Sequence, residues 1–323
     1  MASSHTLPAA RPALHAHFSR GAEPALAIDS GDTVTIRGIP DVSWGLEPPT
    51  STTAPRRKVE PRDPARDNGP CLCGPIAIRN SAPGDALQID IERVVPGKWG
   101  WTYAGKGMSS PAHNAALGLA DAPLTLLRWD LDAASPSGRR VARSHLGHTV
   151  PLRAFPGTIG LAPDEDRASG WVPRTCGGNM DCRELTEGST LFLPVQCPGG
   201  LLSLGDGHAA QGDGELSGTA IECMLEEVRL RITLLKVHRL SSPRIRPARL
   251  PETAPDKPRW ITLGFADTLD TAAANAASAM LDLMVEELNI PRPEAAALAS
   301  SQVDLRITQM VNPLKGVHAV WRY

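Results

Sequence analysis

The stretch "NSAPGDALQIDIERV" (80–94) places a Gly-Asp turn directly before a run of alternating apolar and polar residues. Its apolar residues Leu87, Ile89 and Ile91 fall on one face of an extended chain, because successive side chains of a strand point to opposite faces. The stretches 27–39 and 185–195 repeat this arrangement, each with a glycine shortly before an apolar run. Short strands that follow turns at this spacing are typical of a sandwich or a barrel.

The 30 prolines and 29 glycines of the 323-residue chain also favour strands and turns, since both residues cut helices short. The one long helical pattern is the Ala-rich stretch 268–290, which Pro291 ends, and a shorter helix is expected at "PEAAALASS" (293–301). Further strands are expected at 227–237, 259–265 and 303–311. The sequence therefore predicts a mainly β fold, with a sandwich-like or barrel-like body and a smaller α+β C-terminal portion.

The predicted organisation has three parts. Residues 1–240 form the β-rich body, residues 241–258 form a Pro-rich linker, and residues 259–323 form the α+β portion, which returns to the core. Within the body, the stretch 46–70 is too polar and Pro-rich for a strand or a helix. A loop of this length usually carries function or is partly mobile.

Composition excludes several classes of function. The 33 basic and 35 acidic residues give a net charge of -2, which offers no electrostatic footprint for nucleic acid or anionic lipid. No apolar run reaches the roughly 18 residues that a membrane helix needs, and the N-terminus lacks the pattern of a secretory signal. We therefore expect a cytoplasmic protein whose six cysteines are reduced thiols.

Four segments together resemble the acetamidase/formamidase family of amide hydrolases. They are "GPIAIRNSAPGDALQIDI" (74–91), "FPGTIGLAP" (155–163), the long run 176–223 that begins "CGGNMDC" and ends in "GDGHAAQGDGELSGTAIEC", and "VDLRITQMVNPLKGVHAV" (303–320). The resemblance runs in one order from about His15 to the end of the chain. It implies a sandwich-like body with an α+β C-terminal part, a homo-oligomer, and hydrolysis of small linear amides to carboxylate and ammonia.

The chain departs from the family at one place. Many members carry a histidine shortly before the Gly-Pro pair that matches Gly74 and Pro75, in a pattern such as H-x-L-T-G-P. Here the chain reads "NGPCLCGPI", without a histidine and with Cys71 and Cys73 nearby. Either cysteine is a candidate replacement, since a thiolate is a softer metal ligand. The departure also keeps open an alternative from another class, a small-molecule or metal-binding β-domain with weakened turnover.

The stretch "GDGHAAQGDGE" (205–215) concentrates the candidate chemistry. Asp206 and His208 are two residues apart and would point to the same side of a strand. A carboxylate and an imidazole suit a divalent metal, with zinc as the candidate, and Asp181 of "GGNMDC" is the candidate third ligand. A bound metal would lower the pKa of its water towards about 7. A plain hairpin turn remains the alternative for this stretch.

Other residues are candidates for moving protons and holding charge. Glu215, expected at the start of the returning strand, is the predicted general base and acid, with Glu222 as the alternate. Gly178 and the Asn179 side chain could hold the oxyanion, or simply form a tight turn. A thiolate mechanism through Cys176 or Cys182 is a second possibility. "FPGTIGLAP" (155–163) is expected to be a scaffold turn.

Overall fold

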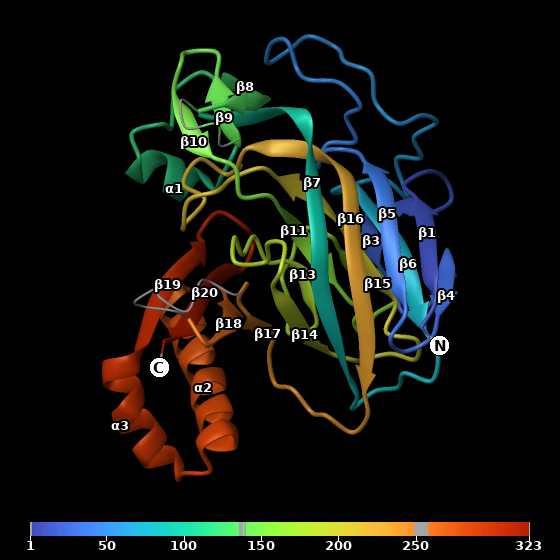
Figure 1. The fold of residues 1–323 in the computed structure, drawn as a ribbon. Coiled ribbons are helices and arrows are strands. Elements are labelled where there is room, and N and C mark those ends of the chain that lie inside the picture. The colour runs from blue at the N-terminus through green and yellow to red at the C-terminus, as the bar shows by residue number, and fades with distance from the viewer. Residues whose placement is uncertain (1, 136–137, 139, 249–257, 323) are drawn as a thin grey trace.

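The structure is a computed structural model that describes residues 2–135, 138, 140–248 and 258–322. It is mainly β, with a β-rich body and an α+β part at the C-terminal end of the chain (Figure 1). This agrees with the predicted fold class. Among the described residues, no helix has both the length and the apolar character required to cross a bilayer.

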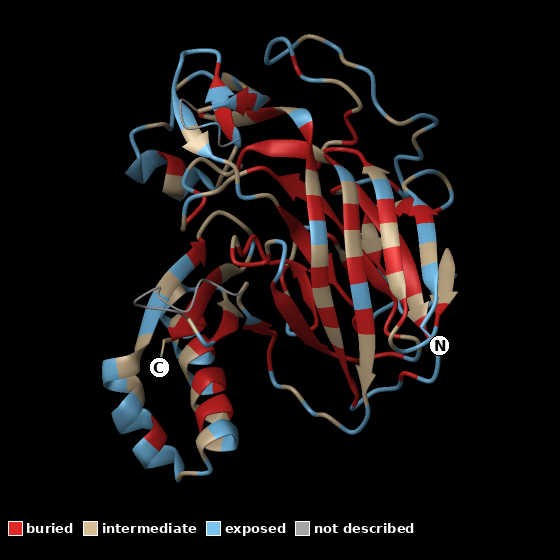
Figure 2. Cartoon of the chain, in the orientation of Figure 1, coloured by how far each residue is buried: buried red, intermediate tan, exposed pale blue. Residues whose placement is uncertain are grey.

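Two long antiparallel strands form the spine of the body. β7 (Ala86–Ala104) pairs with β16 (Glu222–Leu235) along most of its length, and β5 (Thr33–Ile39) pairs with the other edge of β16. Buried and more exposed residues alternate along these strands (Figure 2), as the sequence pattern predicted. The buried faces meet in one large core that includes Leu87, Ile89 and Val228. Each such side chain contributes about 1.5–3 kcal/mol when fully buried.

The strands that carry the candidate site residues, described below, are short and closely packed. β15 (Leu202–His208) pairs with β6 (Leu72–Ile78), β11 (Phe155–Gly160) and β16, and β13 (Gly177–Asn179) pairs with β11. The expectation of a turn at "FPGTIGLAP" was wrong, because residues 155–160 are a strand. Its glycines explain this: Gly160 lies against the Gly178 backbone, and any side chain there would block the pairing.

The remaining elements of the body are short. They are β1 (Ser4–Pro8), β2 (Leu14–His15), β3 (His17–Phe18), β4 (Leu26–Ile28), α1 (Pro111–Ala116), β8 (Thr125–Ala134), β9 (Arg140–Ser144), β10 (Thr149–Pro151), β12 (Ala168–Ser169) and β14 (Thr190–Pro194). The polar stretch 46–70 lies between β5 and β6 and forms the long loop at the top of Figure 1. One isolated bridge, between Gly45 and Lys58, closes part of it.

The α+β part packs two helices against a small sheet. α2 (Leu269–Leu288) lies on β18 (Trp260–Ala266) and β20 (Lys315–Trp321), and α3 (Arg292–Gln302) leads into β19 (Val303–Gln309). Thr268 caps the start of α2, and Asn289 ends it in the left-handed conformation, close to the predicted bounds. β17 (Arg244–Arg246) joins this sheet to β14.

The three-part division of the chain stays a prediction. β17 lies inside the proposed linker 241–258, and residues 249–257 of that linker lie outside the described residues. His318 of β20 is fully buried, and the Thr308 hydroxyl lies 2.8 Å from its Nδ1 atom. It therefore serves the α+β core rather than the site described next.

Candidate active site

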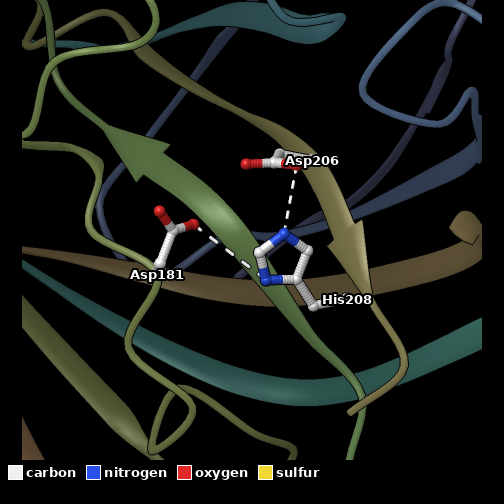
Figure 3. A group of neighbouring side chains, drawn as sticks. All are labelled: Asp181, Asp206 and His208. Carbon is white, nitrogen blue, oxygen red and sulfur yellow. Dashed lines mark hydrogen bonds and ion pairs between the residues drawn. The ribbon is translucent and has the colours of Figure 1, made fainter. Parts of the chain in front are cut away.

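Asp206 and His208 stand at the end of β15 and meet on one side of it (Figure 3). His208 Nε2 lies 3.2 Å from Asp206 Oδ1, and both side chains are buried. The predicted same-side arrangement is therefore present. The plain hairpin interpretation of 205–215 does not fit, because a solvated turn would leave these groups exposed.

Asp181 reaches the same point from the segment that follows β13. Its Oδ1 atom lies 4.0 Å from His208 Nδ1, and its backbone N–H donates to the Gly157 carbonyl at 3.0 Å. One ligand atom from each of Asp181, Asp206 and His208 lies within 4.8 Å of the others. The structure thus brings together the three predicted metal ligands.

Two glutamates complete a group of five, which we call the acid–histidine cluster: Asp181, Asp206, His208, Glu215 and Glu222. Glu222 Oε1 lies 3.4 Å from His208 Nε2 and accepts a hydrogen bond from the Ala220 N–H at 2.9 Å. The expected strand positions of both glutamates were wrong. Glu215 lies in the loop before β16, with a positive φ of 50°, and Glu222 begins that strand rather than ending it.

The backbone at the cluster is held in an uncommon conformation. Asp181, Asp206 and Glu215 have φ values of 49°, 57° and 50°, in the left-handed region that non-glycine residues seldom adopt. Such conformations persist only where surrounding contacts enforce them, and they concentrate at functional sites. Gly157 is one such contact, because it packs closely against two members of the cluster. A Cβ atom at this position would lie 2.6 Å from His208 Cε1 and 2.7 Å from Asp181 Oδ1.

Polar residues around the cluster fix its orientation. Gln211 Oε1 lies 2.9 Å from His208 Nδ1, and Gln211 Nε2 donates to the Asp181 carbonyl at 2.9 Å. Asn312 Nδ2 donates to Asp181 Oδ2 at 2.5 Å, and the Thr158 hydroxyl lies 3.1 Å from Asp206 Oδ2. When His208 Nδ1–H donates to Gln211, the Nε2 atom is left free as an acceptor, as in metal-binding histidines. The sequence did not assign supporting roles to Asn312 and Thr158.

Burial and crowded charge set the protonation of the cluster. Burial and the neighbouring Asp206 raise the pKa of Asp181 to about 7, and burial raises the pKa of Glu222 to about 7. Burial and Asp181 raise the pKa of Glu215 well above its usual range. Burial alone would lower the pKa of His208, but the Glu222 and Asp206 carboxylates hold it well above its usual value. Without a cation, Asp181, Glu215 and Glu222 are therefore partly or wholly protonated near pH 7, which limits the charge repulsion within the cluster.

A divalent cation could take the place of these protons. Asp181 Oδ1 and Glu222 Oε2 are buried and have no hydrogen-bond partner among the described residues. Buried polar atoms are rarely left without partners unless they serve an unseen ligand or a catalytic role. Carboxylate oxygens together with an imidazole nitrogen are a ligand set that binds zinc and other divalent ions. The cluster is therefore a group that can bind a metal.

A cavity of about 860 Å³ opens onto the cluster, whose five members all line it. Asn179 lines it too, with Oδ1 accepting from the Thr158 hydroxyl at 2.5 Å. Gly178 does not line the cavity; a Cβ atom there would lie 2.7 Å from the Val172 carbonyl, so this glycine permits close packing.

The cysteines take no part in the cavity. None of the six lines it or joins the cluster, and all are buried free thiols. Burial raises the pKa of the Cys176 thiol to about 12 and that of Cys182 further still, so a thiolate mechanism is not supported. Cys71 and Cys73 lie at the start of β6 in the hydrophobic core and do not replace the missing histidine as ligands.

Comparisons with known proteins agree with this geometry. A model of the acetamidase/formamidase family matches residues 166–315, the part of the chain that carries the whole cluster. An acetamidase structure from Bacillus halodurans superposes with a TM-score of 0.80 at 27% identity, covering 98% of this chain and 97% of that one. The chain is therefore similar to the acetamidase/formamidase family, both in the region that carries the cluster and in its overall fold.

Curated relatives match a smaller share of the chain. The acetamidase of Mycolicibacterium smegmatis is 28% identical over 209 residues, which is 47% of this chain and 50% of the relative. The formamidase of Methylophilus methylotrophus is 23% identical over 219 residues, which is 51% of each chain. The matched part of the chain thus spans about half the length of these two curated relatives.

Proposed function

We propose that the protein hydrolyses the C–N bond of linear amides, giving a carboxylate and ammonia. The observation that carries the proposal is the acid–histidine cluster, five buried titratable side chains at the closed end of a cavity in an acetamidase/formamidase fold. Amide hydrolysis needs a nucleophilic water, charge stabilisation at the carbonyl oxygen and an acid for the departing amine. The lining of this cavity supplies groups of each kind.

Asp181, Asp206 and His208 would hold a divalent ion, with zinc as our candidate. When bound, such an ion supplies Lewis acidity toward a carbonyl oxygen and lowers the pKa of water. Gln211 and Asn312 keep the imidazole and the Asp181 carboxylate in position through the hydrogen bonds described above. Glu222 lies beside His208 and adds negative charge that favours a cation.

Glu215 is our candidate for moving the proton. Its carboxylate lines the cavity and makes no hydrogen bond or ion pair among the described residues, so it is free to take a proton from water and pass it to the leaving nitrogen. Asn179 is our candidate donor to the carbonyl oxygen. Its Oδ1 atom is occupied by Thr158, which leaves its Nδ2–H groups available in the cavity.

The test is ammonia release from formamide, acetamide and longer amides by metal-replete protein, with and without a chelator. We expect turnover that the chelator removes and that zinc restores. Glu215→Gln keeps the size of the side chain but removes its basicity, so we expect turnover to fall about 10²–10⁴-fold with the metal content unchanged. Near-normal turnover by Glu215→Gln together with loss in Glu222→Gln would move the proton role to Glu222. No release from any amide would refute the proposed function.

We also retain the proposals of a homo-oligomer and of a cytoplasmic location. Leu305 and Ile307 on β19 are 52% and 40% exposed, and a subunit contact would cover them. The six buried free thiols suit a reducing compartment. Light scattering that reports about 34 kDa at micromolar concentration would refute the oligomer.

A further inference from the structure

The cavity is far larger than the simplest amides require. Formamide and acetamide have only three and four non-hydrogen atoms, and one water molecule in the liquid takes about 30 Å³. A cavity of about 860 Å³ is in the range that normally holds ligands of drug-like size. Once an amide group is seated at the acid–histidine cluster, most of the cavity remains for the rest of the substrate.

The charge of the lining changes sign between its buried and its exposed parts. The four acids of the cluster are at most 6% exposed, whereas Lys58 is exposed and also lines a neighbouring hollow. Arg56 lines the cavity as well, but Asp41 accepts a hydrogen bond from its Nη1 atom at 2.5 Å and balances its charge. The Lys58 ammonium has no ion pair or hydrogen bond among the described residues.

The environment of Lys58 favours an incoming anion. Partial burial and then the charge of Arg56 lower the pKa of Lys58 by more than Asp41 and Glu60 raise it, so its charged form is only partly compensated. An anion in hydrogen-bond contact would complete this compensation. The ion pairs of the acid–histidine cluster are with His208, and none of them involves Lys58.

Aromatic side chains cover part of the wall. Trp101 and Tyr103 of β7 line the cavity with ring centroids 4.8 Å apart, and Trp101 Nε1 donates to Asp41 at 2.7 Å. This hydrogen bond and the Arg56 guanidinium 5.6 Å from the ring hold Trp101 in place. Such rings offer a fixed apolar surface for a short methylene chain.

We propose that this enzyme prefers monoamides of linear dicarboxylic acids, with the amide at the acid–histidine cluster, the methylene chain along Trp101 and Tyr103, and the free carboxylate at Lys58. The proposal rests on amide hydrolysis as the function of this site. The size of the cavity and the Lys58 ammonium are the features that favour this substrate class. It adds no step to the reaction, because the distal carboxylate stays unchanged while water cleaves the amide.

The test compares kcat/KM for succinamate, glutaramate and adipamate with that for 5-methylhexanamide, an uncharged shape match of glutaramate, and for acetamide. We expect the best anionic amide to exceed both uncharged amides by fivefold or more in the wild type. Lys58→Met should reduce the ratio of kcat/KM for the anionic amide to kcat/KM for the uncharged amide about fivefold, which corresponds to the upper range of the free energy of an exposed ion pair. Lys58→Glu should reduce this ratio further. Raising the salt concentration from about 0.05 to 0.5 M should also reduce it.

The matched control is Lys98→Met. Lys98 belongs to β7, its side chain is 75% exposed, and it lies outside the cavity, 3.9 Å from Asp132. We expect this variant to keep the wild-type ratio. If acetamide is hydrolysed and the ratio is the same in the wild type, Lys58→Met and Lys58→Glu, the substrate inference is wrong while the proposed function stands.

Binding gives a readout that does not depend on turnover. If no amide is hydrolysed, the proposed function fails, and calorimetry with glutaramate still tests the cavity. Weaker binding of glutaramate to Lys58→Met than to the wild type, with Lys98→Met unchanged, would support the assignment of Lys58 to an anionic group. Equal binding to all three proteins would overturn it.

Discussion

Gly157 shows how a residue without chemistry of its own can control the acid–histidine cluster. We predict that Gly157→Ala lowers kcat/KM for amides by about 10²-fold, because the added Cβ atom would displace His208 or Asp181, and misplacing such groups by about 1 Å has an effect of this size. The measurement is ammonia release together with metal content. Gly212→Ala is the control, since no atom lies within 4 Å of a Cβ placed there. Normal kinetics in Gly157→Ala would mean that the cluster tolerates this shift.

The residues of the site differ in how far the sequence alone could predict them. Asp206 and His208 were predicted because a two-residue spacing on a strand places them on one side, and β15 keeps that geometry. Asn312 was not predicted, since it meets Asp181 across 131 positions of sequence, and no local pattern encodes such a contact. Glu215 was selected as an acid, but its burial in a left-handed turn depends on packing that the sequence does not display.

The buried cysteines provide a test of the thiolate mechanism, which the structure does not support. Cys73, Cys176 and Cys223 are buried, and burial raises the pKa of each thiol, to about 12 for the first two. We predict that the native protein reacts with a thiol reagent at pH 8 far more slowly than the unfolded protein, in which all six cysteines react. A thiol that reacts rapidly in the native protein, with parallel loss of amide turnover, would restore the thiolate mechanism.

The first strand, β1, depends on one carboxylate. Asp32, next to β5, accepts a hydrogen bond from the Ser3 N–H at 2.6 Å, and its Oδ2 atom lies 2.8 Å from His5 Nε2. These contacts lower the pKa of Asp32 from 3.8 to about 2. Its stabilising effect is therefore complete above about pH 4 and is lost as the pH falls towards 2, because protonation then removes the charge from the folded state.

We therefore predict that Asp32→Asn lowers the free energy of unfolding at pH 7, and that its difference from the wild type shrinks below about pH 4. Urea unfolding at pH 7, 5 and 3 is the measurement. Asp29→Asn is the control, because the Asp29 side chain is 66% exposed and pairs only with Arg79 on the surface. A difference that stays constant down to pH 3 would show that the Asp32 charge does not hold β1 in place.

At the scale of the whole molecule, strand alternation and the proline and glycine content were enough to predict a mainly β fold, and the Ala-rich helical spacing was enough to predict the C-terminal helices. β18 and β19 fell close to their predicted ranges of 259–265 and 303–311. The region from 93 to 160 was harder to interpret. β7 runs on to Ala104 and pairs with β8, yet its second half contains a proline, two glycines and three aromatic residues rather than a clear alternation.

The overall stability should depend on the cation that we assign to the acid–histidine cluster. The four buried acids around one imidazole must either hold protons or repel one another in the folded state. A cation bound only to that state stabilises it, by about 2.7 kcal/mol when its free concentration is 100 times Kd. We predict that chelation lowers Tm by several degrees and that adding zinc reverses the change. His208→Ala should show a lower Tm that no longer responds to chelator or zinc, because it lacks the only imidazole in the cluster. A wild-type Tm that is unaffected by chelator and zinc, with no metal in the purified protein, would contradict the assigned site, since the cluster would then be stable through shared protons alone.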